Sequence, residues 1–174
     1  MRPPRSVSPL DTPKLEQLAL RYVERFATTR GKLRDYLTRK IRERGWDDER
    51  APDAAGVAER MAQRGYVDDR GFAEMKGAAL ERRGFGVRRV AETLRAAGVV
   101  AADAQVAIDH ARAAAWENAL RLAERRRIGP FALEEASDPR VRQRHLGMLL
   151  RAGHDSAIAR RIVSARPGEI PEPD

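Results

Sequence analysis

Arginine is the residue type in this sequence with the clearest capacity for chemistry. Thirty of the 34 basic residues are arginine, and the formal net charge is +8. A guanidinium group stays charged and holds carboxylate or phosphate oxygens through paired hydrogen bonds. This excess of positive charge favours an acidic protein surface or a nucleic acid as partner. Enrichment in arginine and alanine also follows from a GC-rich genome, so the composition by itself leaves both explanations open.

The candidate partner-binding arginines lie in a short turn, RRGFG, or on helical segments farther along the chain. They are Arg82, Arg83, Arg88, Arg89, Arg95, Arg125, Arg126, Arg142 and Arg144, with Arg127 and Arg151 in the same segments. Cations are common in the last turn of a helix, so an ordinary solvated face is one interpretation. A basic stripe that faces an acidic partner or phosphates is the other.

Residues for other kinds of chemistry are absent or poorly placed. The chain has no cysteine, which excludes disulfides, thiolate nucleophiles and zinc–thiolate sites. His110, His145 and His154 lack the spacing of metal ligands, and no serine is placed by a motif beside a histidine. The acidic pairs at 47–48 and 68–69 stand beside helix starts, where carboxylates cap helices. We therefore expect no catalytic residue, no metal and no cofactor.

The apolar residues repeat at the spacing of amphipathic helices, and no strand pattern is present. Three segments end in a glycine at 45, 98 and 153, which are 53 and 55 residues apart. Counted back from that glycine, position −4 is Ile41, Leu94 or Leu149. Position −8 is Leu37, Val90 or His145, and position −12 is Leu33, Gly86 or Val141. Basic residues recur too, with Arg89 and Arg144 at position −9 and Arg34 and Arg142 at position −11. Such a period is typical of a repeat protein.

The sequence therefore predicts an all-α fold: an elongated array of three tandem three-helix modules, with about nine helices. The expected modules are 15–66, 67–110 and 111–164, and a helix shared by the last two, around 109–117, is an alternative. The proline-rich ends, 1–14 and 165–174, are expected to be disordered, the second one acidic. No stretch has the length of a signal peptide core or a membrane span, so we expect a cytoplasmic monomer away from membranes.

The stretch GYVDDRGFAEMKGAALERRGFGVRRVAETLRAAGV, residues 65–99, resembles the signature of the RecX family. In that signature a glycine–aromatic turn, an Asp-Asp-Arg-x-Phe-Ala helix start and an Arg-Gly-aromatic-Gly turn precede a helix that ends in Leu-x-x-x-Gly. The resemblance continues into TTRGKLRDYLTRKIRERGW and RQRHLGMLLRAGHDSAIARRIV, so that it covers about residues 15–164. The sequence departs from the family at Thr29 and Lys32, where serine and glutamate are frequent, and at His154, where an aromatic residue is expected.

The resemblance implies a regulator of homologous recombination and of the SOS response. It implies that the chain binds in the groove of the RecA–DNA filament and lowers recombinase, ATPase and co-protease activity. Weak contact with DNA of any sequence is expected beside the RecA contact.

Three-helix units with tight glycine turns and a basic surface are also typical of helix-turn-helix DNA-binding proteins. No wing is visible in the sequence, but this alternative stays open here. A reader of one DNA sequence would prefer one duplex, whereas a filament-binding protein would bind DNA weakly and without regard to sequence.

Overall fold

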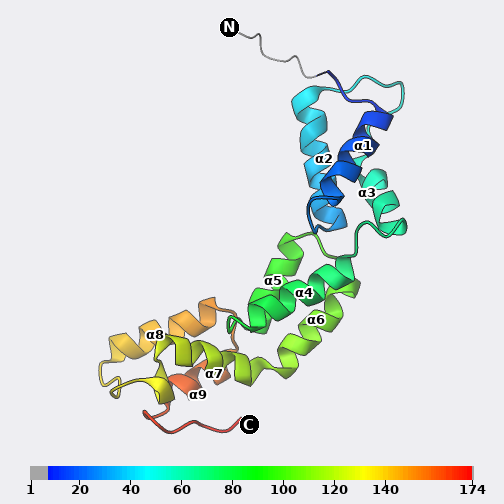
Figure 1. Ribbon diagram of the computed structural model, residues 1–174. Coiled ribbons are helices and arrows are strands. Elements are labelled where there is room, and N and C mark those ends of the chain that lie inside the picture. The colour runs from blue at the N-terminus through cyan, green and yellow to red at the C-terminus, as the bar shows by residue number, and fades with distance from the viewer. Residues whose placement is uncertain (1–7, 174) are drawn as a thin grey trace. The chain divides into compact units, whose positions relative to one another are not determined.

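The computed structural model describes residues 8–173, and this part of the chain is all-α, as the sequence predicts (Figure 1). Its helices in chain order are α1 (Thr12–Val23), α2 (Arg30–Arg44), α3 (Ala54–Gln63), α4 (Asp69–Glu81), α5 (Val87–Ala96), α6 (Ala101–Ala113), α7 (Ala115–Arg126), the 3₁₀ helix η1 (Gly129–Phe131), α8 (Pro139–Arg151) and α9 (Ser156–Ser164). The boundary expected around 109–117 is a break at Ala114 between α6 and α7 and not one continuous helix.

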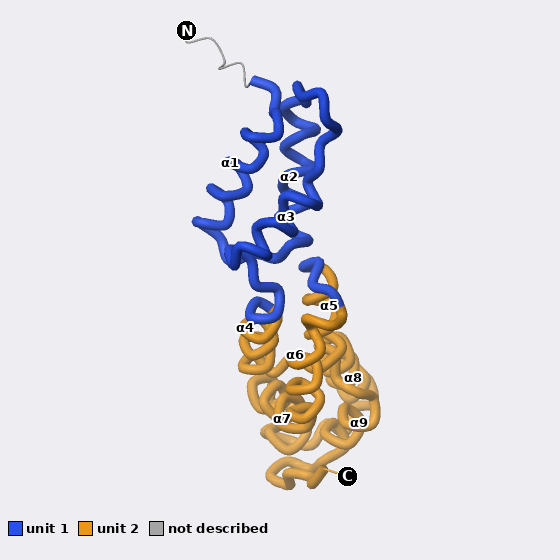
Figure 2. Tube along the Cα trace, turned by 90° about the vertical axis from the view of Figure 1, so that its right-hand side faces the viewer, with its two compact units in different colours: residues 1–72, 97–100 blue, residues 73–96, 101–174 orange. Residues whose placement is uncertain are grey.

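The chain forms two compact units, which Figure 2 colours separately. Unit 1 comprises residues up to 72 together with 97–100, and unit 2 comprises 73–96 and 101–174. Residues 8–173 contain nine α-helices, which is about the number that the sequence predicts. The division into modules at 66/67 and 110/111 stays a prediction.

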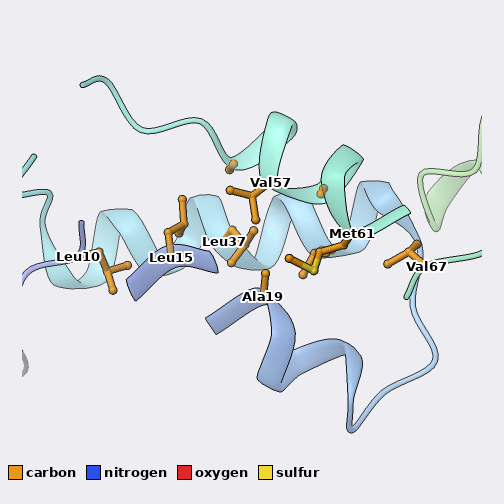
Figure 3. Packing of buried hydrophobic residues seen from close by; sticks show 10 residues of the cluster. Leu10, Leu15, Ala19, Leu37, Val57, Met61 and Val67 are labelled. Carbon is orange, nitrogen blue, oxygen red and sulfur yellow. The ribbon is translucent and has the colours of Figure 1, made fainter. Parts of the chain in front are cut away.

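The core of unit 1 lies between α1, α2 and α3 (Figure 3). Leu15, Leu37 and Met61 supply one large buried side chain from each helix. Thr29 caps the start of α2, because its hydroxyl accepts a hydrogen bond from the Lys32 amide at 3.1 Å. Such a cap satisfies an amide that has no partner inside the helix.

Residues 8–14 differ from the disordered tail that the sequence predicts for 1–14, while residues 1–7 lie outside the described residues. Leu10 is fully buried, and its amide and carbonyl pair with Gly45 and Asp47 at 3.0 and 2.8 Å. Helix α1 starts at Thr12, with Pro13 in its first turn. Proline fits there because the first helical amides need no partner within the helix. The other tail also makes a contact, since the Gly168 amide donates to the Pro130 carbonyl at 2.8 Å.

The core of unit 2 that concerns function lies between α7, α8 and α9. Its buried side chains include Leu122, Ile128, Leu149 and Ile162, and Phe85 packs against them from the turn between α4 and α5. Asp138 and Asp155 cap α8 and α9 by accepting from backbone amides at 2.8 and 2.7 Å. The helix pairs are therefore fixed at their ends as well as along their apolar faces.

The three repeated glycines all adopt a backbone conformation with a positive φ angle. Gly45, Gly98 and Gly153 have φ angles of 82°, 73° and 91°, a region that side chains disfavour. The position eight residues earlier is fully buried at Leu37 and Val90 and partly buried at His145. The apolar columns of the repeat thus correspond to buried helix faces, with the histidine as the weakest member.

One backbone contact occurs in the same form in each unit. In unit 1, an added Cβ on Gly31 would lie 2.6 Å from the Cα of Gly98. In unit 2, an added Cβ on Gly86 would lie 2.7 Å from the backbone nitrogen of His154, just after Gly153. In both places the backbone at the start of one repeated helix meets the backbone at the end of the next repeated segment.

Candidate functional site: an arginine-lined groove

The turn between α4 and α5 positions the first wall of the site. Gly84 has a φ of 76°, and the amide of Phe85 donates to the Leu80 carbonyl at 3.1 Å, which closes the end of α4. This hydrogen bond pattern is the usual glycine-dependent helix end. Gly84 also lies tightly against α7, since an added Cβ would be 2.8 Å from the Leu122 amide nitrogen. The turn therefore places Arg83 and Phe85 beside α7.

A cavity of about 360 Å³ in unit 2 joins this turn to the ends of α7 and α8. We call it the arginine groove, and it is lined by Arg83, Phe85, Leu122, Arg125, Arg126, Met148, Arg151 and Ala152. Leu122 and Ala152 belong to the core and are 8% and 7% exposed, whereas all four arginines are exposed. The groove thus has an apolar interior and a strongly basic surround.

Two of the groove arginines, Arg83 and Arg125, make a ring contact or a backbone hydrogen bond, and neither pairs with an acid in the described part of the chain. The guanidinium of Arg125 donates to the Arg83 carbonyl at 3.0 Å, and that of Arg83 lies 5.0 Å from the centre of the Phe85 ring. The guanidinium of Arg89, outside the groove, lies 6.0 Å from the same ring. Within residues 8–173, none of the four groove arginines forms an ion pair with a carboxylate.

Four uncompensated guanidinium groups around one cavity attract anions. Arginine does not lose its proton under physiological conditions, so the positive charge is permanent. Its planar fork suits carboxylate and phosphate oxygens, and the low polarity of the groove interior weakens the screening of that attraction. The groove therefore combines an apolar interior with groups that attract carboxylates or phosphates.

Two buried polar residues, His154 and Glu81, make hydrogen bonds that stabilise the turn between α4 and α5. His154 is 1% exposed, and its Nε2 donates to the Gly84 carbonyl at 2.9 Å. Burial lowers the pKa of His154, while the hydrogen bond to Gly84 opposes that shift. Glu81, also buried, lies 3.0 Å from Nδ1 of His110, and Arg121 donates to its carbonyl at 2.9 Å. These contacts fix the end of α4 and so the position of Arg83.

Other kinds of site find no support in the described residues. Across 8–173, no three histidine, aspartate, glutamate or cysteine side chains come together as metal ligands would. None of the helices described is both long enough and apolar enough to cross a membrane. One residue of each acidic pair accepts from an amide in the first turn of a helix: Asp68 from Gly71 in α4 and Asp48 from Thr12 in α1, at 2.9 and 3.0 Å. The helix after the pair 47–48 is instead capped by Asp53, which differs from the expectation that this pair stands beside a helix start. Hydrogen bonds from Thr12 lower the pKa of Asp48 to about 2.

Comparison with known proteins decides the family. No family model matches the chain. A protein from Myxococcus xanthus (strain DK1622) named regulatory protein RecX is 31% identical over 174 aligned positions, which cover 94% of this chain and 90% of that protein. Proteins of the same name from Mycobacterium sp. (strain JLS) and Mycobacterium sp. (strain KMS) are each 34% identical over 162 positions, which cover 90% of this chain and 85% of theirs. The chain belongs to the RecX family.

The residues on which the RecX resemblance rests form a helix cap, an ion pair and a turn in this chain. Asp68 caps α4. The carboxylate of Asp69 accepts hydrogen bonds from the backbone amide and from the guanidinium of Arg30, at 2.8 and 3.1 Å. Gly84 and Phe85 form the turn that borders the arginine groove. The stretch 65–99, which carries the resemblance, therefore contributes Arg83 and Phe85 to the lining of the groove.

The structure brings together only some of the arginines that the sequence suggests as binding residues in this RecX-family chain. Arg83, Arg125 and Arg126 line the groove. Arg142 instead donates to the carbonyls of Ala136 and Ser137 and lines two other cavities. The remaining candidates are exposed outside the groove: Arg82, Arg88, Arg89, Arg95 and Arg144.

The groove also contains residues outside the main set of candidate arginines. The sequence indicates Arg151 only together with the other basic residues of its segment, and its spacing does not set it apart from them. Leu122 and Met148 look like ordinary core residues in the sequence, because they lie on apolar helix faces. Phe85 has one sequence signal, which is its position between two glycines at the junction of two helical segments.

Proposed function

We propose that this chain regulates the RecA recombinase by binding to the RecA–DNA filament through the arginine groove. The observation that carries the proposal is the set of four groove arginines that no carboxylate of residues 8–173 neutralises. Membership in the RecX family supports RecA as the target. Binding at the groove lowers recombinase, ATPase and co-protease activity of the filament, and no catalysis by this chain is needed.

The excess of positive charge adds a second, weaker contact. Exposed arginines outside the groove, such as Arg88, Arg95 and Arg144, can approach the phosphates of the DNA in the filament. Such contacts depend steeply on salt and do not distinguish sequences. They raise the local concentration of the protein at the filament, while the groove provides the specific contact with protein.

The direct experiment follows ATP hydrolysis by RecA on single-stranded DNA while the protein is added in substoichiometric amounts. We expect strong inhibition at less than one copy per several RecA protomers. A matched titration onto DNA without RecA should give weak, salt-sensitive and sequence-independent binding. No inhibition together with tight binding to one particular duplex would overturn the proposal in favour of a helix-turn-helix DNA-binding protein.

A further inference from the structure

We infer that the occupant of the arginine groove is an acidic peptide segment in which carboxylates flank one large apolar side chain. The inference rests on the proposed function, in which a protein partner binds at this groove. It adds the chemistry of the partner segment that occupies the groove. It comes from one juxtaposition: an apolar cavity of about 360 Å³ surrounded by four arginines from three separate parts of the chain.

The apolar part of the groove suits a single side chain. Leu122, Met148 and Ala152 present aliphatic and thioether groups, and the cavity is near the lower end of the volumes of ~300–1,000 Å³ that are typical of ligand sites. Methionine adapts readily to the shape of an apolar partner. A phenylalanine or leucine anchored there would cover the exposed edge of the core, as central residues of interfaces do.

The basic part of the groove suits carboxylates on both sides of that anchor. Arg83 comes from the turn after α4, Arg125 and Arg126 from the last turn of α7, and Arg151 from the last turn of α8. Because the arginines come from three segments that meet at the cavity, an extended peptide that inserts an apolar side chain brings its neighbouring residues close to them. Acidic neighbours would supply the negative charge that no described carboxylate of unit 2 supplies to the groove arginines.

A nucleic acid fits the groove less well than a peptide. Single-stranded nucleic acids bind on free aromatic faces, where their bases stack. The guanidinium of Arg83 already lies over the ring of Phe85, and that of Arg89 lies within 6.0 Å of its centre. The other apolar groups are aliphatic and offer no stacking surface. Phosphates would use the arginines but leave the apolar cavity unfilled.

The test measures fluorescence anisotropy of a short labelled peptide of aspartate and glutamate with one central phenylalanine, bound to the full chain. The same peptide with a central serine tests the cavity, and we expect it to bind about tenfold more weakly, because a buried phenylalanine is replaced. A thymidine oligonucleotide of equal length, at the same salt concentration, tests the nucleic acid alternative.

Variants of the chain locate the binding. The double variant Arg126→Glu, Arg151→Glu should bind the phenylalanine peptide at least about tenfold more weakly, since it places like charges in the groove. The control is Arg21→Glu, Arg64→Glu, which makes the same change of charge at the ends of α1 and α3 in unit 1 and should leave affinity unchanged. Unchanged circular dichroism confirms that each variant keeps its helices.

Each outcome bears on the inference separately from the proposed function. Equal affinity for the phenylalanine and serine peptides would overturn it, because the cavity would then have no part in binding. Preference for the oligonucleotide that is lost in Arg126→Glu, Arg151→Glu would also overturn it and assign the groove to nucleic acid. If the peptide fails to bind while the chain still inhibits RecA, this inference falls and the proposed function stands. If the peptide binds but the chain does not inhibit RecA, the inference stands and the proposed function falls.

Discussion

Arg125 donates a hydrogen bond from its guanidinium to the backbone carbonyl of Arg83, at 3.0 Å. The two residues are 42 positions apart in the sequence, so this bond joins the end of α7 to the turn after α4. The bond keeps Arg83 and Arg125 at the same groove, and it orients the guanidinium of Arg125. Substitution of Arg125 would therefore change structure as well as charge. Arg126 and Arg151 have no such bond to another residue of 8–173, which makes them the better positions for testing the role of charge.

The close approach of Gly86 to the end of α8 predicts that Gly86→Ala lowers the free energy of unfolding of unit 2. An alanine Cβ would lie 2.7 Å from the backbone nitrogen of His154, and the Gly86 amide would lose its 2.9 Å bond to the Ala152 carbonyl. Backbone cannot move aside as a side chain can, so we expect a loss of about 3 kcal/mol. Urea unfolding followed by the fluorescence of Trp116, in a Trp46→Phe background, measures it.

Gly147→Ala is the matched control for that substitution. Gly147 lies within α8, and an added Cβ there would meet only the mobile end of the Arg151 side chain, at 3.0 Å. Alanine favours the helix over glycine, so we expect a gain of about 0.5–1 kcal/mol. Equal losses in Gly86→Ala and Gly147→Ala would show that the contact between the two backbones is not what restricts residue 86.

The burial of His154 predicts that unit 2 loses stability in mild acid. Its Nε2 donates to Gly84, and its Nδ1 has no hydrogen bond partner within residues 8–173, so protonation would bury a charge without an acceptor. Burial holds the pKa of His154 in the folded protein below the ordinary value of 6.5. The stability from this group is therefore complete above that value and is lost as the pH falls from it toward the lower folded pKa.

The experiment compares urea unfolding between about pH 7.5 and pH 5 for the parent chain and for His154→Phe. The variant restores the aromatic residue expected in the family, and its stability should fall less with acid. A smaller slope remains from His145, whose pKa is lowered by partial burial and by Arg144; adding His145→Gln should reduce it further. An unaltered pH dependence in His154→Phe would count against this account.

Thr29 links two parts of unit 1 through one hydroxyl group. The hydroxyl accepts from the Lys32 amide at 3.1 Å and donates to the Ala97 carbonyl, and the residue is fully buried. Thr29→Val keeps the shape but removes both bonds, so we expect unit 1 to lose about 2 kcal/mol. Thr29→Ser should lose much less, because the hydroxyl remains. Trp46 fluorescence in a Trp116→Phe background reports unit 1, and equal losses in the two variants would assign the effect to packing.

The sequence predicts helices well here because local signals mark their ends and faces. Helix α8 begins directly after the capping residue Asp138, with Pro139 as its first residue, and α9 begins directly after the capping residue Asp155. Gly45, Gly98 and Gly153 end the repeated segments with positive φ angles. Residues 8–14 were mispredicted because their prolines suggest disorder, whereas burial of Leu10 depends on a pairing with Gly45 and Asp47 that no local pattern reveals.

The sequence predicts only part of the candidate site, because the rest depends on contacts between distant segments that no local pattern reveals. Arg83, Arg125 and Arg126 are recognisable as basic residues at helix ends, and that signal is local. Their meeting with Arg151 around Leu122 and Met148 results from packing of α7, α8 and the α4–α5 turn. Arg142 looks equivalent in the sequence, but its guanidinium is used by the carbonyls of the loop before α8.

The central claim is that the groove arginines make the contact with RecA, and ATP hydrolysis by the RecA filament tests it most directly. The chain, Arg126→Glu, Arg151→Glu and the control Arg21→Glu, Arg64→Glu are each titrated onto RecA on single-stranded DNA at one salt concentration. We predict that the groove variant needs at least about tenfold more protein for half-inhibition, whereas the control matches the parent chain. Full inhibition by the groove variant, or equal loss in both variants, would contradict the claim.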